Sequence, residues 1–351
     1  MPGQDRFSHQ ANDVNDHGWI DSNTNRDLSN DRQILDELAK RASRYSVNLN
    51  KRVSKDNVFC LRGGFAMVSA GTLQPRELVA TEGSAGRGFP GDSKIIRVAI
   101  KTPRGGIPGD VELITNFLRE VHTWSKLNHA NILPLIGITT EFDQTVSIVS
   151  PWMEKGNARN FVCDRFHDPR PFIKGIASGL CYLHNRNPNP LYHGDVKGLN
   201  VLISSDGRAL LTDFGLSLLT NSSFSMPTPA EIGGSIAWLA PEMLDGGEPS
   251  ATRDVWAFAM TALELFTCKD PFHPARGRGL FTRISRGQPE RPKAEDTCFR
   301  LTNEWWDMCS ECWHTDPASR PTMSELATRI EQMSLIDTRR CYIFIPQLKM
   351  V

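Results

Sequence analysis

The residue pattern of this chain changes from strand-like in its first part to helical in the remainder. From about Asn57, the segments NVFCLRGG, AMVSAGTL and IIRVAIK are short and rich in the residues that favour strands. After Glu154, three longer segments repeat apolar residues at helical spacing: FIKGIASGLCYLH, DVWAFAMTALELF and NEWWDMCSECW. Strands grouped ahead of helices predict an α+β fold with a small β-rich part and a larger helical part.

The chain of 351 residues is longer than one hydrophobic core usually fills, so we expect two packed parts with tails. Residues 1–28 are rich in Asn, Asp, Ser and Gln and are expected to be disordered. Residues 29–45 have apolar side chains at helical spacing, and they either dock on the folded body or form a short solvated helix. The Gly-rich stretch 81–94 is expected to be a surface insertion, and the final segment CYIFIPQLKMV is an apolar, strand-like patch.

Charge and composition exclude several classes of function. The net charge is zero, so neither nucleic acid nor an acidic membrane surface is expected as a partner. The longest apolar stretch, Val255 to Phe266, is too short to span a membrane and contains Glu264. Eight scattered cysteines fit a reducing compartment, so we expect a cytoplasmic location. Cys309 and Cys312 lack further ligands for zinc and are expected to be half-buried on a helix.

The strand IIRVAIK places a lysine beside a small residue. Strand alternation puts Arg97, Ala99 and Lys101 on one face and Ile96, Val98 and Ile100 on the other. The small Ala99 leaves room for a flat ring next to the Lys101 ammonium group. Taken alone, a strand lysine is usually a solvated edge residue.

The following helix, NFLREVHTWSKL, carries a carboxylate within its apolar stripe. Phe117, Glu120, Trp124 and Leu127 are spaced three, four and three residues apart. A carboxylate in such a stripe needs a cationic partner or takes up a proton, and Lys101 is the natural candidate. The alternative is that Glu120 lies at the edge of the stripe and reaches water.

The segment LYHGDVKGLNVLISSDGRALLTDFGLS predicts a hairpin that carries oxygen ligands. The Asp-Gly pair at 206–207 lies between the strands VLI and ALL. A turn centred on that pair places Asn200 opposite Asp213, and a carboxylate with an amide oxygen suits Mg²⁺ bound together with phosphates. Asp195 then lies on the loop entering the site, where it could accept a hydroxyl proton, and Lys197 adds a positive charge.

These segments together resemble the signature of the eukaryotic protein kinases in order, spacing and context. The corresponding segments are VAIK at 98–101, HGDVKGLN at 193–200, DFG at 213–215, APE at 240–242, DVWAFAM from 254 and ECWHTDPASRPTM around 320. The resemblance covers roughly residues 56–334. The segments SPWMEKGN, WLAPE and ECW resemble the corresponding segments of the tyrosine-kinase-like group, most of all those of its fungal-type Ser/Thr kinases.

The resemblance implies a two-lobed protein kinase fold, a small β-rich N-lobe with one main helix and a larger α-helical C-lobe. The implied bounds are 56–153 for the N-lobe, with an insertion at about 80–94, and 154–334 for the C-lobe. Residues 1–50 would be a disordered tail with a possible short helix, and 335–351 a C-terminal extension. Glu242 and Arg320 would form a buried structural ion pair.

The resemblance also implies ATP and Mg²⁺ as cofactors, protein substrates with Ser or Thr acceptors, and roles for individual residues. Asp195 would orient the acceptor hydroxyl, with Lys197 as the Ser/Thr-type residue after it, while Asn200 and Asp213 would hold Mg²⁺. Lys101 would hold the α- and β-phosphates and pair with Glu120. The residues implied around the nucleotide are Gly63, Gly64, Ala66, Val68, Ala99, Lys101, Glu120, Ser150 at the gatekeeper position, and Met153.

Two departures from the signature carry expectations of their own. The glycine loop keeps only its middle glycine, Gly63, with Gly64 as an extra, and a non-glycine residue forced to positive φ costs about 1–2 kcal/mol. That cost predicts weakened nucleotide affinity and retained activity. Gly194 stands where many kinases have an arginine that pairs with a phosphate on the activation segment. Phosphorylation of Ser222, Ser223, Ser225 or Thr228 is therefore expected to be unnecessary.

Three functions are compatible with these residues. An active Ser/Thr protein kinase is favoured, because all five residues of the catalytic type are present. They are Lys101, Glu120, Asp195, Asn200 and Asp213. A pseudokinase that binds nucleotide or acts as a scaffold is the alternative that the poor glycine loop supports. A small-molecule kinase is disfavoured by the APE segment and the region around Arg320, which serve protein substrates.

Overall fold

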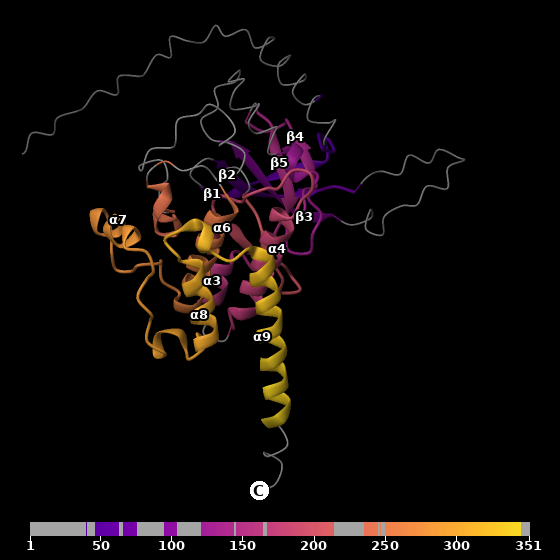
Figure 1. Ribbon diagram of the computed structural model, residues 1–351. Helices are drawn as coiled ribbons and strands as arrows, with labels where there is room; N and C mark the ends of the chain where they lie inside the picture. The colour runs from indigo at the N-terminus through magenta and orange to yellow at the C-terminus, as the bar shows by residue number, and fades with distance from the viewer. Residues whose placement is uncertain are drawn as a thin grey trace, which may run out of the picture.

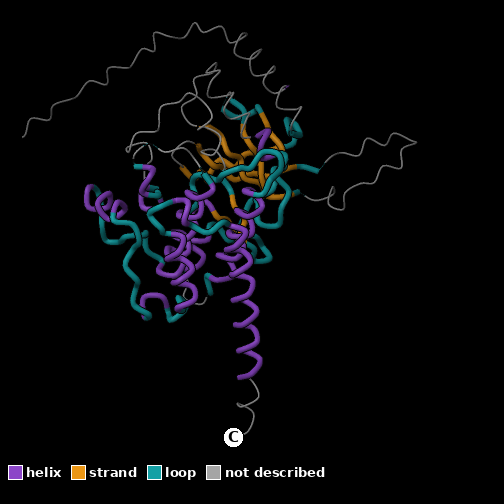
Figure 2. The backbone as a smooth tube through the Cα atoms, viewed as in Figure 1, coloured by secondary structure: helices purple, strands orange, loops and turns teal. Residues whose placement is uncertain are grey.

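The computed structural model describes residues 40, 46–62, 66–75, 95–103, 121–143, 145–163, 167–213, 235–244, 246 and 250–344. Its strands gather in one part and most of its helices in a larger part beside it (Figures 1 and 2). The sequence predicts this division into a small strand-rich part, the N-lobe, and a larger helical part, the C-lobe.

The N-lobe is built on a five-stranded sheet in which each strand runs antiparallel to its neighbours, in the order β1-β2-β3-β5-β4. The strands are β1 (Val53–Arg62), β2 (Ala66–Leu73), β3 (Ile96–Pro103), β4 (Gly137–Thr139) and β5 (Ser147–Pro151). Strand β1 thus begins four residues before the predicted start at Asn57. On one face of the sheet, Val98 and Ile100 are completely buried and cluster with Leu49, Val53 and Val149. Alternation then turns Ala99 and Lys101 to the opposite face, as predicted.

The C-lobe is helical, and several of its helices pack on α6. They are α3 (Ala158–Val162), α4 (Arg170–His184), α6 (Ala251–Thr267), α7 (Arg278–Ser285), α8 (Asn303–Cys312) and α9 (Met323–Phe344). Helix α6 begins where the Ser250 hydroxyl accepts a hydrogen bond from the Arg253 N–H, which caps the first turn. Twelve of its 17 residues are buried, and it contacts α3, α4 and α8. The three helical segments predicted from the sequence correspond to α4, α6 and α8.

The C-lobe also contains a short hairpin and several 3₁₀ turns. They are β6 (Val201–Ile203), β7 (Ala209–Leu211), η1 (Gly198–Asn200), η2 (Ile236–Trp238), η3 (Pro241–Met243), η4 (Glu295–Thr297) and η5 (Pro317–Ser319). The hairpin packs on α4 through β7. Its Leu211 carbonyl accepts a hydrogen bond from the N–H of Leu133, in the segment that leads to β4.

Two local expectations were wrong. Residues 341–344, predicted as the start of a strand-like patch, continue α9, which extends away from the body of the molecule (Figure 1). Strand propensity is not enough without a partner strand, and a helix already in progress adds one hydrogen bond per residue. Cys309 and Cys312 are completely buried and not half-buried, and desolvation raises the pKa of Cys309 to about 12.

Among the described residues no helix is long and apolar enough to cross a bilayer.

The predicted ion pair between Glu242 and Arg320 is present and is bidentate. Two guanidinium nitrogens of Arg320 lie 2.7 and 2.8 Å from the two carboxylate oxygens of Glu242. The Arg320 side chain is fully buried, and it also donates to the carbonyls of His314 and Thr252 and stacks over Trp256. The guanidinium group therefore joins η3, α6 and the end of η5 in the C-lobe core.

Replacing Arg320 with Met should lower the free energy of unfolding by about 3 kcal/mol, because three acceptors lose their donor inside the fold. Urea denaturation measures this change. The matched control is Arg329→Met, which breaks the exposed pair with Glu311 at 2.8 Å and should cost less than about 1 kcal/mol. Equal losses for the two variants would contradict a structural role for the buried pair.

Candidate active site

The register of the sheet brings the predicted nucleotide residues of the strands to one face. Lys101 on β3 pairs with Val68 on β2 and Ile148 on β5, and Ala99 pairs with Ser150. Directly paired residues project to the same side of a sheet, so Val68, Ala99, Lys101 and Ser150 share one face. Ala66 belongs to the same set, and the partly buried Met153 follows β5 and packs against the large core.

Lys101 reaches across to the hairpin of the C-lobe. Its Nζ lies 2.6 Å from Oδ1 of Asp213. Desolvation opposes ionisation of Asp213, but the Lys101 charge and hydrogen bond outweigh it, and the pKa of Asp213 is lowered. Because the Asp213 side chain is 49% exposed, it keeps much of its hydration, and the charge of Lys101 decides the direction of the pKa shift. Asp213 also has a φ of +68°, an uncommon backbone conformation that often marks functional positions.

The catalytic loop, residues 193–200, holds Asp195 from two sides. Lys197 Nζ lies 2.6 Å from Oδ2 of Asp195 and 2.6 Å from Oγ of Ser235. The Asn200 side-chain amide donates to the carbonyl and to Oδ2 of Asp195, both at 2.8 Å. These bonds fix the Asp195 carboxylate between a cation and an amide, and they join the loop to Ser235.

The predicted pairing of Asn200 with Asp213 was wrong by one residue. In the β6–β7 ladder Val201 pairs with Leu211, and the Thr212 N–H donates to the Asn200 carbonyl at 3.0 Å. The loop has three residues between Ser204 and Arg208, and Gly207 takes a φ of +85°. A three-residue hairpin loop with a left-handed glycine shifts the register that a two-residue turn would give. Asp213 thus lies one residue beyond the position opposite Asn200.

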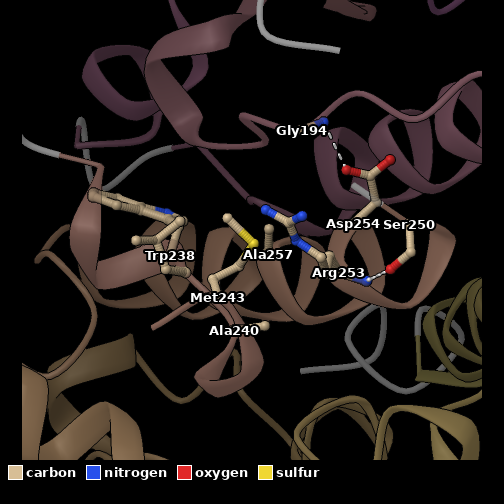
Figure 3. Close-up of a pocket in the computed structure, with 9 residues that line it drawn as sticks. Gly194, Trp238, Ala240, Met243, Ser250, Arg253, Asp254 and Ala257 are labelled. Carbon is tan, nitrogen blue, oxygen red and sulfur yellow. Dashed lines mark hydrogen bonds between the residues drawn. The ribbon is translucent and has the colours of Figure 1, made fainter. Parts of the chain in front are cut away.

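Asp254 anchors the backbone of the catalytic loop to α6. Its carboxylate accepts the N–H group of Gly194 at 2.8 Å (Figure 3). It also accepts the N–H group of His193 at 2.7 Å, and His184 Nε2 lies 2.9 Å away. Desolvation would raise the pKa of this buried carboxyl, but His184, His193 and the backbone donors lower it overall. His193 Nε2 in turn lies 3.0 Å from the Thr212 carbonyl, next to Asp213. The loop and the hairpin are thereby fixed to one helix.

A small hollow beside Gly194 lies between the catalytic loop and the start of α6 (Figure 3). Trp238, Met243 and Arg253 are among its lining residues. The sequence alone suggests that the loop lacks a counter-charge because residue 194 is glycine. The structure places the Arg253 side chain along the same hollow, so a cation does lie near this position.

Glu264 is a buried carboxylate that the sequence interpretation did not connect with the site. Its side chain has no exposed surface, and Oε2 accepts hydrogen bonds from the Gly198 N–H at 2.8 Å and the Trp238 Nε1–H at 3.1 Å. Desolvation outweighs these donors and raises the pKa of Glu264 to about 7. The signal in the sequence was a lone carboxylate within an apolar helix, the same signal that singled out Glu120.

Glu120, Gly63 and Gly64 lie outside the described residues, so their predicted roles stay predictions. For Mg²⁺, the oxygens present are suitable: an ionised Asp213 carboxylate and the Asn200 amide oxygen, whose amide nitrogen is engaged with Asp195. The described part of the chain has no group of three or more His, Cys, Asp or Glu side chains that could hold a metal. Two protein oxygens fit an ion that takes its remaining ligands from water and phosphate.

The fold, the lysine on β3 and the loop that carries Asp195 together define a protein kinase domain. Residues 61–330 match the family model for protein tyrosine and serine/threonine kinases, and the chain belongs to that family, as a eukaryotic protein kinase of the tyrosine-kinase-like type.

Curated relatives agree with this assignment. The chain is 30% identical over 71% of its length to the probable L-type lectin-domain containing receptor kinase VII.2 of Arabidopsis thaliana, covering 40% of that protein. It is 28% identical over 73% of its length to the dual specificity protein kinase shkC of Dictyostelium discoideum, covering 50% of it. Mitogen-activated protein kinase kinase kinase 7 of Drosophila melanogaster is 31% identical over 58% of the chain, and 30% of that protein is covered. The chain thus spans half or less of each of these relatives.

Replacing Asp213 with Asn should remove the Mg²⁺-dependent part of ATP binding, because the predicted metal site would lose its charged oxygen ligand. Thermal shifts with ATP in Mg²⁺ and in EDTA measure this part, and the apparent affinity in Mg²⁺ should fall roughly tenfold or more. Asp206→Asn, at the tip of the same hairpin, is the control and should keep the Mg²⁺ effect. An unchanged Mg²⁺ effect in Asp213→Asn would remove Asp213 from the metal site.

Proposed function

We propose that this chain transfers the γ-phosphate of Mg-ATP to Ser or Thr hydroxyls of protein substrates. The observation that carries the proposal is the bridge made by Lys197, whose ammonium lies 2.6 Å from both Asp195 and Ser235. The bridge places a cation and a carboxylate together beside the segment that leads into APE, at 240–242. This arrangement suits a hydroxyl acceptor that must be oriented while charge develops on the transferred group.

The Asp195 carboxylate would accept the hydrogen bond of the acceptor hydroxyl and orient it for transfer. Asn200 and Lys197 hold this carboxylate in place, and Lys197 would offset negative charge on the phosphoryl group. Lys101 would bind the α- and β-phosphates, and Glu120 would orient Lys101.

The nucleotide would lie against the face of the sheet that carries Val68, Ala99 and Ser150. Ala66 and Met153 would border the adenine, and Gly63 and Gly64 would cover the phosphates. The small Ser150 at the gatekeeper position supports an accessible space behind the adenine. Asn200 and Asp213 would hold Mg²⁺, which supplies charge neutralisation on the phosphates when bound.

We further propose the lobe boundaries 56–153 and 154–334, with 1–50 and 335–351 as extensions of the kinase domain. A cytoplasmic site of action and protein partners, with no nucleic acid, are part of the same proposal. They are supported by the zero net charge and the scattered cysteines.

Asp195→Asn should lower kcat at least about 10²-fold, because the acceptor hydroxyl loses its orienting carboxylate. The measurement is phosphate transfer from Mg-ATP to a generic Ser/Thr substrate, with the Mg-ATP thermal shift recorded for the same variant. The shift should persist in Asp195→Asn, since Lys101 and Asp213 are unchanged. A thermal shift in the wild-type protein without any transfer would support the pseudokinase alternative, and transfer chiefly to tyrosine would contradict the Ser/Thr assignment.

Replacing Ser222, Ser223, Ser225 and Thr228 together with Ala should leave turnover within a few-fold of the wild type. The reason is that Gly194 provides no arginine to pair with a phosphate there. Mass spectrometry of the isolated protein gives the phosphate content, and steady-state assays give the turnover. A loss of two orders of magnitude would overturn this prediction and would direct attention to Arg253 as the cation beside Gly194.

A further inference from the structure

One carboxylate oxygen joins two segments that the proposed reaction needs side by side. Oε2 of Glu264 accepts the N–H of Gly198 at 2.8 Å, and Gly198 lies in the catalytic loop between Lys197 and Asn200. The same oxygen accepts Nε1–H of Trp238 at 3.1 Å, and Trp238 lies in the turn that follows Ser235. Glu264 therefore connects the loop that carries Asp195 to the segment that leads into APE.

The approach of Glu264 to the loop depends on the absence of a side chain at Gly198. A Cβ atom at residue 198 would lie 2.9 Å from Oε1 of Glu264 and 3.0 Å from Cβ of Arg159. Both distances are shorter than such contacts normally allow. Glycine at 198 and glutamate at 264 thus form a matched pair: the first leaves the space that the second occupies.

The charge of Glu264 is only partly balanced. Arg159 on α3 has its Nη1 3.6 Å from Oε1 of Glu264, but the same nitrogen lies 2.6 Å from Asp270, after the end of α6. In the described part of the chain, Oε1 receives no hydrogen bond. The hydrogen-bond donors that η1 and η2 provide to Glu264, the Gly198 N–H and the Trp238 Nε1–H, are uncharged. The ammonium group of Lys197, next to Gly198, is engaged with Asp195 and Ser235.

We propose that Glu264 is a positioning residue for phosphoryl transfer: it holds the catalytic loop against the segment after Ser235, and the Arg159–Asp270 pair sets how firmly it does so. This proposal rests on the proposed kinase activity. An ionised Oε2 forms charge-assisted bonds to its two donors, roughly twice as strong as neutral ones, so the ionised form positions the loop better.

Because the pKa of Glu264 is about 7, its ionisation changes within the physiological range. Arg159 favours the ionised form and Asp270 opposes it. Weakening the Asp270 influence should therefore move the ionisation to lower pH, and removing Arg159 should move it to higher pH. A residue with a purely structural role would show neither displacement.

The first experiment compares Glu264→Gln with the wild type from pH 6 to 8.5, as a ratio of kcat values at each pH. Because both proteins use the same ATP and the same substrate, the effect of pH on these two reactants cancels in the ratio of the kcat values. Wild-type kcat should exceed that of Glu264→Gln about tenfold at pH 8.5 and by less than about twofold at pH 6, with KM for ATP little changed. Glu311→Gln, an exposed carboxylate paired with Arg329, is the control and should give a constant ratio near one.

The second experiment tests the direction of the effect. Asp270→Asn should shift the midpoint of the kcat profile to lower pH, and Arg159→Met should shift it to higher pH. Both residues are at least partly exposed, so these variants should fold even if Glu264→Gln does not. A constant ratio for Glu264→Gln, or shifts of the same sign for both other variants, would overturn the proposal.

Unfolding provides a readout that does not require kinase activity. A raised pKa in the folded state means that Glu264 contributes stability at low pH and that this contribution is lost as the pH rises from about 4.5 to about 7. Urea denaturation of the wild type should show this loss, and Glu264→Gln should lack it. If the wild-type protein transfers no phosphate but the stability profiles differ as expected, the kinase proposal fails while the titration of Glu264 stands. Equal stability profiles for the wild type and Glu264→Gln would refute the titration itself.

Discussion

The catalytic loop is held by two buried carboxylates at opposite ends of α6. Asp254 accepts the N–H groups of His193 and Gly194, and Glu264 accepts that of Gly198. Backbone N–H groups are obligatory donors, so these bonds position the loop without using the side chains that face the substrate. The pKa values of the two carboxyl groups are shifted in opposite directions. His184 is a further partner of Asp254, and the pKa of Asp254 is lowered. One oxygen of Glu264 receives no hydrogen bond in the described chain, and the pKa of Glu264 is raised.

Within the part of the chain that the structure describes, a strong charge pair joins the two lobes. Lys101 belongs to the five-stranded sheet and Asp213 follows the β6–β7 hairpin of the C-lobe. The hairpin is itself tied to α6 through His193, which lies against the Thr212 carbonyl beside Asp213. The helix that holds the catalytic loop therefore also holds the residue proposed to bind the metal. A displacement of α6 would move both groups together.

Much of this arrangement could be predicted from the sequence. The separation of strand-like from helical segments gave the fold class, and alternation on β3 gave the face of Lys101. The hairpin was predictable, but its register was not, because Asp-Gly fits both a two-residue turn and the three-residue loop in which Gly207 is left-handed. Glu264 was visible as a charge in an apolar helix, yet its partner Gly198 has no side chain to reveal the contact.

Two glycines of the catalytic loop, of which Gly194 is a departure from the kinase signature, are best understood together with α6. Glycine at 198 is required by the glutamate that approaches it, since a Cβ there would meet Glu264 and Arg159. Glycine at 194 donates its N–H to Asp254 and borders a hollow that Arg253 of the same helix also lines. In both places a loop side chain is absent and α6 supplies the ionisable group. The loop and the helix therefore form one functional unit, and substitution at 194 or 198 should be judged by its effect on α6.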